Sequence, residues 1–269
     1  MAGLVIKPRS RIYHGHDWIY SSEVQKTFGT PKDGDVVSLK DGNDRTLGSA
    51  IYNSKSQIVA RRISRQKQDL DLDFFERRIR QAADYRLRRG IDPRLCRVVW
   101  SESDAIPGLI VDRYGDHLVL QTLTLAMDQR KELIVEALRR VLEPRSIVER
   151  NDSPIRKAEG LELVGGMLFG DAPAPFTIEI DGISFEIDLV HGQKTGFYLD
   201  QAASYREVAR FAKGRKVLDC FSNQGAFALA CAKAGAEKVT AVEISGDCVD
   251  LIKANAARNG LTVETHAAN

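Results

Sequence analysis

An apolar segment that ends in an acid, followed by a turn of small residues and a helix, constrains this chain more than any other feature. Residues 217–219 read Val-Leu-Asp, and helical spacing begins at about Ala226. A second apolar run then ends in Glu243. This order predicts a strand–turn–helix–strand unit, because parallel strands need a crossover connection. Such sheets bind ligands at the carboxyl ends of their strands, where Asp219 and Glu243 stand.

The rest of the chain predicts a mixed α/β protein with three domains. Short runs separated by turns, such as 36–39, 47–52 and 58–63, predict a small β-barrel over residues 1–70. A helix over 71–89, with Asp71 as its N-cap and Gly90 at its end, opens a central α/β domain over 71–191. Helix and strand patterns then alternate, which predicts part of a doubly wound parallel sheet over 192–269.

Basic residues gather in the first part of the chain. Residues 1–100 carry 20 Lys and Arg against 12 Asp and Glu, a net charge of +8, whereas the whole chain has +2. Such clustering suits a polyanion, since each neutralised phosphate releases counterions. A solvated helix face explains the same pattern equally well, because acids are interleaved with the arginines between 69 and 84. Charge alone leaves both readings open.

Composition and cysteine spacing favour a protein of the cytoplasm. Apolar residues make up 43% of the chain and charged residues 28%, as in globular proteins. No apolar run reaches the ~18 residues of a membrane helix, and no signal-peptide core follows Met1. The four cysteines show no CxxC spacing, so we expect reduced thiols and no metal site.

The turn after Asp219 discriminates between cofactors. Only Gly225 stands where a dinucleotide fingerprint needs three glycines, and the bulky Phe221 hinders close approach of a pyrophosphate. A ligand without a pyrophosphate, such as S-adenosylmethionine, suits this loop better. Asp219 would then face the cationic methionine end, and Glu243 would accept hydrogen bonds from the ribose hydroxyls. An ordinary α/β turn with helix-capping acids remains the alternative.

A second cluster of function-capable residues precedes this unit. Residues 192–201 read Gly-Gln-Lys-Thr-Gly-Phe-Tyr-Leu-Asp-Gln. Aromatic rings in this segment could stack on a purine, and Asp200 or Gln201 could form hydrogen bonds with the polar edges of the purine. The alternative is a simple connector between domains.

These segments together resemble the bacterial large-subunit ribosomal RNA cytosine-5 methyltransferases. The resemblance rests on 191–201, on 218–227 with its Asp-Cys-Phe-Ser run, and on 104–114; Gly15–Ser21, Glu149–Asp152, Arg156 and Glu159–Leu161 also match. It implies an N-terminal PUA domain, a central α/β domain and a C-terminal class I methyltransferase domain. Ala202 and Ala203 depart from the family, which usually has arginines there, and Glu243 stands where Asp is common.

The resemblance implies S-adenosylmethionine as cofactor and structured ribosomal RNA as partner. It assigns cofactor binding to Lys194, Thr195, Phe197, Asp200, Gln201, Asp219, Phe221, Gly225 and Glu243. RNA binding is expected at Lys7, Arg9, Arg11, Arg61, Arg62, Arg77 and Arg78.

The same resemblance indicates that catalytic residues are missing. Methylation of cytosine C5 needs a thiolate that attacks C6 and a base that removes the C5 proton. The family carries its nucleophilic cysteine and an Asp-Pro-Pro segment after the third strand of this sheet, so they are expected beyond Asn269. We therefore interpret the chain as an inactive fragment whose four cysteines are structural.

Other functions are not excluded by the sequence. A non-catalytic RNA-binding protein could use the partial sheet as a docking or dimerisation surface. An unrelated NAD-dependent enzyme is disfavoured by the glycine-poor loop. The resemblance and the unfinished sheet both favour a homodimer.

Overall fold

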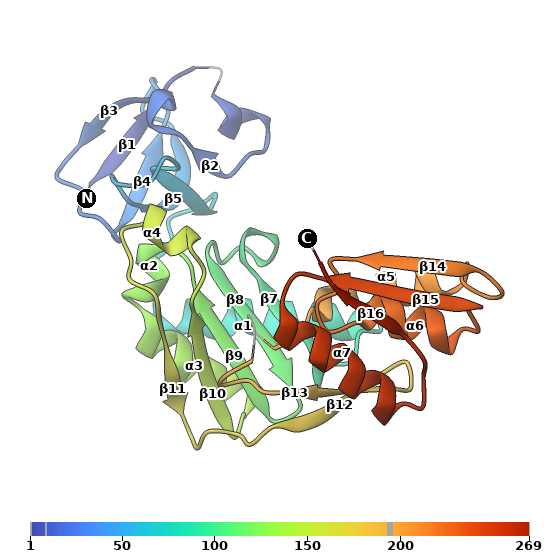
Figure 1. Cartoon of the computed structure of the whole chain (residues 1–269). Helices are drawn as coiled ribbons and strands as arrows, with labels where there is room; N and C mark the ends of the chain where they lie inside the picture. Colours follow the sequence, from blue (N-terminus) through green and yellow to red (C-terminus); the bar gives the residue numbers. More distant parts are fainter. Residues whose placement is uncertain (1, 9, 193–195, 269) are drawn as a thin grey trace. The chain divides into compact units, whose positions relative to one another are not determined.

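The computed structural model describes residues 2–8, 10–192 and 196–268, and divides into two compact units, Met1–Ala172 and Pro173–Asn269. The mixed α/β class predicted from the sequence is confirmed (Figure 1). The sequence analysis placed residues 173–191 in the central domain, but their hairpin packs with the second unit. The division into three domains remains a prediction.

A curled six-stranded sheet forms the beginning of the first unit. Its strand order is β2-β6-β5-β4-β1-β3, in which only β1 and β4 pair in parallel. Apolar side chains such as Leu4, Ile6 and Leu39 alternate inward and fill its core. The elements are β1 (Gly3–Ile6), η1 (Arg11–His14), β2 (Trp18–Ile19), η2 (Ser21–Glu23), β3 (Val24–Phe28), β4 (Val36–Lys40), β5 (Thr46–Tyr52) and β6 (Ala60–Ser64).

A five-stranded sheet with order β11-β10-β9-β8-β7 completes the first unit. Helix α1 begins as predicted, because the Asp71 carboxylate accepts a hydrogen bond from Phe74 N at 2.9 Å, and it packs on α3. The elements are α1 (Leu72–Arg88), β7 (Leu95–Trp100), η3 (Ser101–Asp104), β8 (Leu109–Tyr114), β9 (His117–Thr122), α2 (Leu125–Asp128), α3 (Lys131–Leu142), β10 (Ser146–Asn151), α4 (Ile155–Ala158) and β11 (Val164–Phe169).

A buried arginine joins three segments of this sheet domain. Arg156 is only 1% exposed. Its guanidinium donates to the Thr122 carbonyl oxygen, to Asp128 Oδ1 at 3.0 Å and to the Glu162 carbonyl oxygen at 2.9 Å. Burial opposes ionisation of Asp128, but hydrogen bonds from Thr122 and Arg156 outweigh it and lower the pKa of this carboxyl. Arg156 is therefore a structural centre rather than a surface cation.

The second unit holds a hairpin and a three-stranded parallel sheet with order β14-β15-β16. Asn259, which directly follows α7, ties the hairpin to the unit, since it accepts from Ser184 N at 2.8 Å and donates to Ser184 O at 2.8 Å. The elements are β12 (Phe176–Ile180), β13 (Ile183–Ile187), η4 (Leu199–Gln201), α5 (Ala202–Ala209), β14 (Lys216–Cys220), α6 (Ala226–Lys233), β15 (Lys238–Glu243), α7 (Gly246–Arg258) and β16 (Glu264–Ala267).

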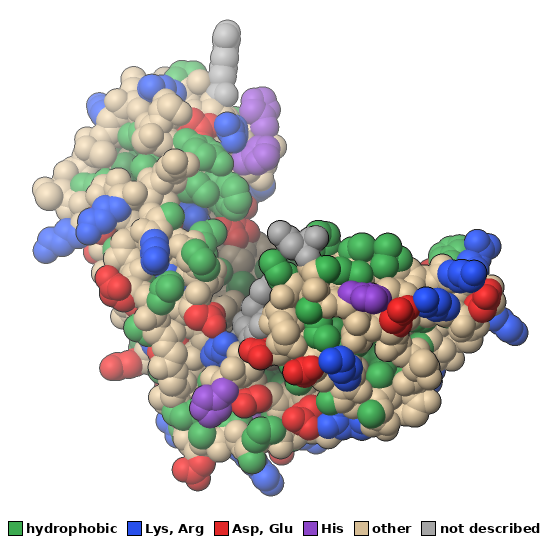
Figure 2. Space-filling model, viewed as in Figure 1, with side chains coloured by type: hydrophobic (Ala, Val, Ile, Leu, Met, Phe, Trp, Pro, Cys, Tyr) green, Lys and Arg blue, Asp and Glu red, His purple; other side chains and the backbone are tan. Residues whose placement is uncertain are grey.

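Small residues of α6 and the branched Ile252 of α7 pack on one face of this sheet. The other face of β14 carries Leu218, which is 65% exposed, and the exposed Cys220. Figure 2 shows hydrophobic side chains gathered over this strand. Parallel sheets are normally covered on both faces, so this open surface is unusual. None of the helices found in the described residues is long and apolar enough to cross a membrane.

Candidate functional site

A cavity of about 490 Å³ lies at the carboxyl ends of β14 and β15, within the second unit. We call it the carboxyl-end cavity. Its volume falls in the range of small-molecule sites, and its place is the one expected for ligands of parallel sheets. It is lined by Phe197, Tyr198, Asp200, Gln201, Tyr205, Phe221, Ser222, Asn223, Gln224, Ala226, Phe227 and Glu243.

The cavity brings together five of the nine residues assigned to a cofactor from the sequence. These are Phe197, Asp200, Gln201, Phe221 and Glu243. Asp219 and Gly225 do not line it, although they belong to the adjoining turn. Lys194 and Thr195 lie outside the described residues.

The turn between β14 and α6 is backbone-strained where it meets the cavity. Phe221 and Asn223 adopt positive φ angles of 61° and 49°, a region that non-glycine residues rarely occupy. Neighbouring bonds hold them there, because Ser222 N donates to the Val242 carbonyl oxygen at 3.1 Å and Asn223 N donates to Glu243 Oε2 at 2.8 Å. Phe221 is 84% exposed. The held backbone thus presents an exposed aromatic residue at the cavity.

Glu243 connects the two strand ends. Its second oxygen, Oε1, accepts from Ser245 N at 3.1 Å, at the start of α7. The half-buried carboxylate therefore has both oxygens engaged by backbone donors and still lines the cavity. A carboxylate oxygen has two lone pairs, so each can accept a further hydrogen bond from a ligand.

Gly225 is required by the fold of the turn itself. Its φ is +81°, and a Cβ there would lie 3.0 Å from Ile252 Cγ2 of α7. These two facts account for the glycine without a ligand.

Asp219 has a clear structural partner. Its Oδ2 accepts from Ala228 N at 3.1 Å in the first turn of α6. Burial raises the pKa of this carboxyl and the charge of Glu243 adds to the effect, whereas hydrogen bonds from Ala228 and Ser222 oppose it. The folded chain therefore disfavours the charged form of Asp219.

We predict that Asp219→Asn will make the second unit more stable than the wild type at pH 7. Because the folded pKa lies above the ordinary value of 3.8, the wild type loses stability as pH rises from that value through the raised pKa. The asparagine oxygen can still accept from Ala228 N and does not titrate. Urea unfolding at pH 4 and pH 7 tests this, and the advantage of the variant should grow with pH. A pH-independent difference would show that the charge of Asp219 is not disfavoured.

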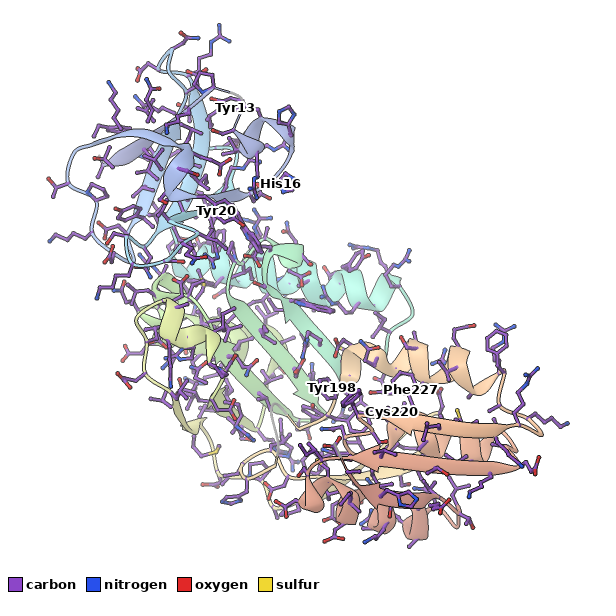
Figure 3. The ribbon with its side chains drawn as sticks, turned by 45° about the horizontal axis from the view of Figure 1, so that its top comes forward. Tyr13, His16, Tyr20, Tyr198, Cys220 and Phe227 are labelled. Carbon is purple, nitrogen blue, oxygen red and sulfur yellow. The ribbon has the colours of Figure 1, made fainter. Side chains whose placement is uncertain are left out.

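Two aromatic residues of the cavity wall, Tyr205 and Phe227, were not assigned to the site from the sequence. Tyr198 belongs to segment 192–201, whose aromatic rings were expected to stack on a purine (Figure 3 labels Tyr198 and Phe227). Tyr205 packs edge-on against Phe227 at 4.6 Å between ring centroids, and its hydroxyl donates to the Tyr198 carbonyl oxygen at 3.0 Å. Gln224 donates to the Gly196 carbonyl oxygen at 2.7 Å, and its buried Oε1 has no donor among the described residues. An aromatic residue at helical spacing is typical of a hydrophobic core, so nothing in the sequence indicated that Tyr205 or Phe227 would line a cavity.

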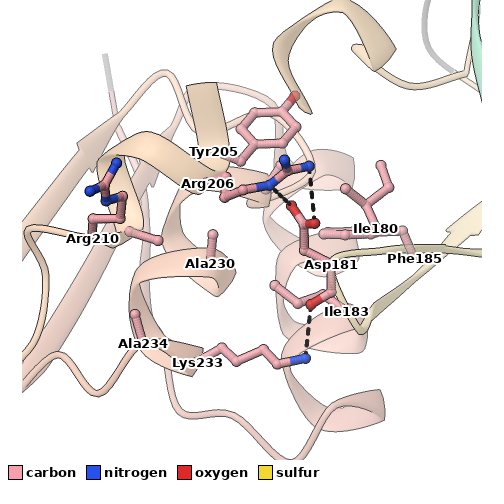
Figure 4. A pocket seen from close by; sticks show the side chains of 12 residues that line it. Ile180, Asp181, Ile183, Phe185, Tyr205, Arg206, Arg210, Ala230, Lys233 and Ala234 are labelled. Carbon is pink, nitrogen blue, oxygen red and sulfur yellow. Dashed lines mark hydrogen bonds and ion pairs between the residues drawn. The ribbon is translucent and has the colours of Figure 1, made fainter. Parts of the chain in front are cut away.

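A second, apolar cavity of about 270 Å³ lies between the hairpin and helices α5 and α6 (Figure 4). It shares Tyr205 and Ala226 with the carboxyl-end cavity. Arg206 at its rim pairs with Asp181 at 3.2 Å, and Lys233 donates to the carbonyl oxygens of Asp181 and Gly182. These cations fasten the hairpin to the helices.

Several arginines expected to contact RNA are engaged within the first unit. Arg62 pairs with Asp17 at 2.6 Å, and Arg61 lies 3.5 Å from Glu102 and 3.4 Å from Glu159. Their side chains are only 8% and 13% exposed. Lys7, Arg11 and Arg77 are exposed, and Arg9 lies outside the described residues. RNA contacts by this set remain a prediction.

The described residues hold no group of three or more His, Cys, Asp or Glu side chains that could bind a metal ion. Of the four cysteines, Cys96, Cys231 and Cys248 are buried and Cys220 is exposed. Burial raises the pKa of Cys96 to about 11 and also raises the pKa of Cys231. Neither of these two thiols is poised to ionise near neutral pH.

Comparison with known proteins agrees with this geometry. Residues 7–65 match a family model described as a PUA-like domain, and residues 162–266 match one described as an S-adenosylmethionine-dependent methyltransferase. Among solved structures, a SAM-dependent methyltransferase from Streptococcus mutans is 25% identical with a TM-score of 0.84, covering 100% of this chain and 71% of that one. A methyltransferase complexed with SAH gives the same identity and TM-score over 70% of its length.

Two curated relatives carry the same name. Ribosomal RNA large subunit methyltransferase I of Aeromonas salmonicida is 38% identical over 267 residues, covering 96% of this chain and 67% of that protein. The protein of that name from Shewanella amazonensis is 40% identical over 250 residues, covering 91% and 63%. The chain thus spans about two thirds of the length of these relatives. The cofactor of this type of methyltransferase is S-adenosylmethionine, as predicted from the sequence. The chain belongs to the ribosomal RNA large subunit methyltransferase I family.

Proposed function

We propose that this chain carries the RNA-binding and cofactor-binding parts of an S-adenosylmethionine-dependent methyltransferase that acts on cytosine C5 of large-subunit ribosomal RNA. The observation that carries the proposal is the carboxyl-end cavity, where the segment before α5 and the ends of β14 and β15 meet. Family membership and the PUA-like match over residues 7–65 support it. Such a protein would work in the bacterial cytoplasm, where ribosomal RNA is found.

Four residues of the cavity contact the cofactor in this proposal. Glu243 accepts hydrogen bonds from the ribose hydroxyls, because its oxygens keep free lone pairs. Phe221 covers the adenine with its exposed ring. Asp200 and Gln201 bond the polar edges of the ligand. When bound, S-adenosylmethionine supplies the methyl group.

Four further residues assigned to the cofactor from the sequence also have a part in this proposal. Asp219 orders the first turn of α6 and sets the charge near the methionine end, and Gly225 allows the turn to close on α7. Lys194 and Thr195 close over the ligand in this proposal. Their part rests on the resemblance alone.

We further propose that the nucleophile of the reaction is not among the four cysteines of this chain. Attack on C6 needs an accessible thiolate beside the bound base. Cys96, Cys231 and Cys248 are buried, and the exposed Cys220 does not line the carboxyl-end cavity. The 269-residue chain therefore binds the cofactor but transfers no methyl group.

Calorimetric titration and a transfer assay test these proposals together. The purified chain should bind S-adenosylmethionine saturably, with no incorporation of labelled methyl groups into large-subunit ribosomal RNA. Failure to bind the cofactor would contradict the proposed cavity. If methyl transfer occurs, the missing-nucleophile proposal is wrong, and the methylated nucleoside recovered after digestion shows whether C5 is the acceptor. Light scattering of the same sample tests whether the chain is a homodimer.

A non-catalytic RNA-binding protein is the second candidate. The observation that favours it is the open apolar surface around β14, where Leu218, Phe221 and Ile244 are 65%, 84% and 64% exposed. In this alternative the sheet is a docking or dimerisation surface. RNA binding that weakens steeply with salt, without any response to S-adenosylmethionine, would favour it.

A further inference from the structure

A polar cavity of about 190 Å³ lies inside the first unit, where β6 of the curled sheet meets α1 and η3. We call it the junction pocket. It does not overlap the carboxyl-end cavity, which belongs to the second unit. Its wall consists of Asp17, Arg62, Ile63, Ser64, Arg65, Arg78, Glu102, Ala105 and Pro107.

Both acids of the junction pocket already have partners. Asp17 pairs with Arg62 at 2.6 Å. Glu102 accepts from Trp18 Nε1 at 2.8 Å and lies 3.5 Å from Arg61 Nε. Arg65 and Arg78 form no ion pair among the described residues. The acids that line the pocket are therefore neutralised by ion pairs, whereas the charges of Arg65 and Arg78 are not.

One nitrogen of the Arg78 guanidinium lacks an acceptor within the described part of the chain. Its Nη2 donates to the Ile63 carbonyl oxygen at a long 3.4 Å, and its guanidinium lies over the Phe74 ring at 5.6 Å. The buried Nε has no hydrogen-bond partner among the described residues. Buried N–H groups almost always have an acceptor, so the Arg78 guanidinium in the pocket wall keeps unused hydrogen-bonding capacity. Burial and the neighbouring Arg77 lower the pKa of Arg78, and an anion bound beside it would favour the charged form.

An aromatic ring is fixed beside the pocket. Trp18 follows the wall residue Asp17 in the chain, and its Nε1 donates a hydrogen bond to Glu102, which lines the pocket. The Arg61 guanidinium stands 5.9 Å from its ring centroid. The indole nevertheless remains 41% exposed. A held but exposed indole is a surface on which an unpaired base can stack.

We propose that the junction pocket binds one backbone phosphate of a single-stranded RNA segment, with an adjacent base stacked on Trp18. A guanidinium group can donate two parallel hydrogen bonds to the oxygens of one phosphate. A bound phosphate would therefore supply the negative charge that Arg65 and Arg78 lack. The stacking ring distinguishes a nucleic acid from a free anion. The inference rests on the proposed RNA-binding function and gives it a defined contact.

Fluorescence anisotropy with a short labelled single-stranded RNA, repeated over a series of salt concentrations, tests the proposal. Arg65→Ala and Arg78→Gln should each weaken binding about tenfold at low salt and reduce the salt slope by about 0.7 to 1, the value for one phosphate contact. Trp18→Ala should weaken binding roughly tenfold with the slope unchanged, and Trp18→Phe should restore most of the affinity.

Arg80→Ala is the matched control, because it removes the same charge from the same helix at an exposed position outside the pocket. Arg65 is also exposed, so its variant should fold even if the loss of Arg78 disturbs α1. Unchanged unfolding midpoints confirm that the variants are folded.

The outcomes separate this inference from the function on which it rests. If the wild type binds RNA and the pocket variants behave like Arg80→Ala, the junction pocket is not the contact, while the RNA-binding function stands. If the wild type does not bind RNA, both fail. Displacement of RNA by inorganic phosphate at equal concentration would show that Trp18 adds nothing, and would overturn the assignment to RNA.

Discussion

Glu243→Gln is expected to lower the affinity for S-adenosylmethionine by about 10- to 100-fold. In our proposal the carboxylate accepts hydrogen bonds from both ribose hydroxyls, and bonds to a charged group contribute about 1.5–3 kcal/mol each. The amide oxygen can still accept from Asn223 N, whereas the amide nitrogen can no longer accept from Ser245 N, so the unfolding midpoint of the variant is compared with that of the wild type. Calorimetric titration of the variant and the wild type measures the change.

Glu264→Gln supplies the control for this experiment. Glu264 lies on the neighbouring strand β16, pairs with Lys238 at 2.7 Å and does not line the carboxyl-end cavity. Its neutralisation should leave cofactor affinity within about twofold, since a surface ion pair contributes at most about 1 kcal/mol to stability. Equal affinity for wild type and Glu243→Gln would exclude the ribose contact.

Arg156→Ala should destabilise the first unit by about 3–5 kcal/mol. The substitution leaves the carbonyl oxygens of Thr122 and Glu162 without this donor and removes the 3.0 Å contact to Asp128, all around a fully buried side chain. Asp128 keeps Lys131 at 3.2 Å, so the lower half of the range is the more realistic. For a unit of this size the midpoint of thermal unfolding should fall by roughly 10 °C.

Tryptophan emission measures this effect selectively, because both tryptophans, Trp18 and Trp100, belong to the first unit. Lys157→Ala, at the next and exposed position of α4, is the control and should change stability by less than about 0.5 kcal/mol. A small effect of Arg156→Ala would mean that water replaces the guanidinium without cost.

Local patterns predicted the elements well where a single signal dominated. The N-cap at Asp71 and the strand ends at Asp219 and Glu243 come from short-range rules, and the structure places an element boundary at or next to each of them. Residues 125–142 form two helices, α2 and α3, with a break after Asp128. Asp128 bonds to Thr122 and Arg156, and such tertiary contacts have no sequence periodicity. Strand β11 begins Val-Gly-Gly, which is a poor strand signal in the sequence.

The candidate site was predictable only in part, for the same reason. Glu243 and Phe221 stand at positions that the strand–turn–helix pattern specifies. Tyr205 and Phe227 enter the cavity because two helices pack together, which the sequence does not encode locally. Charge density likewise could not separate Arg62, which is paired, from Arg65, which is not.

The close packing of Gly225 on Ile252 limits how this family can vary. A larger residue at 225 must tolerate a positive φ and also needs space that Ile252 occupies. We expect homologues with asparagine at the first position to carry a smaller residue at the second, so that the two sites change together. Evolution of the turn is therefore tied to a helix more than twenty residues further along the chain.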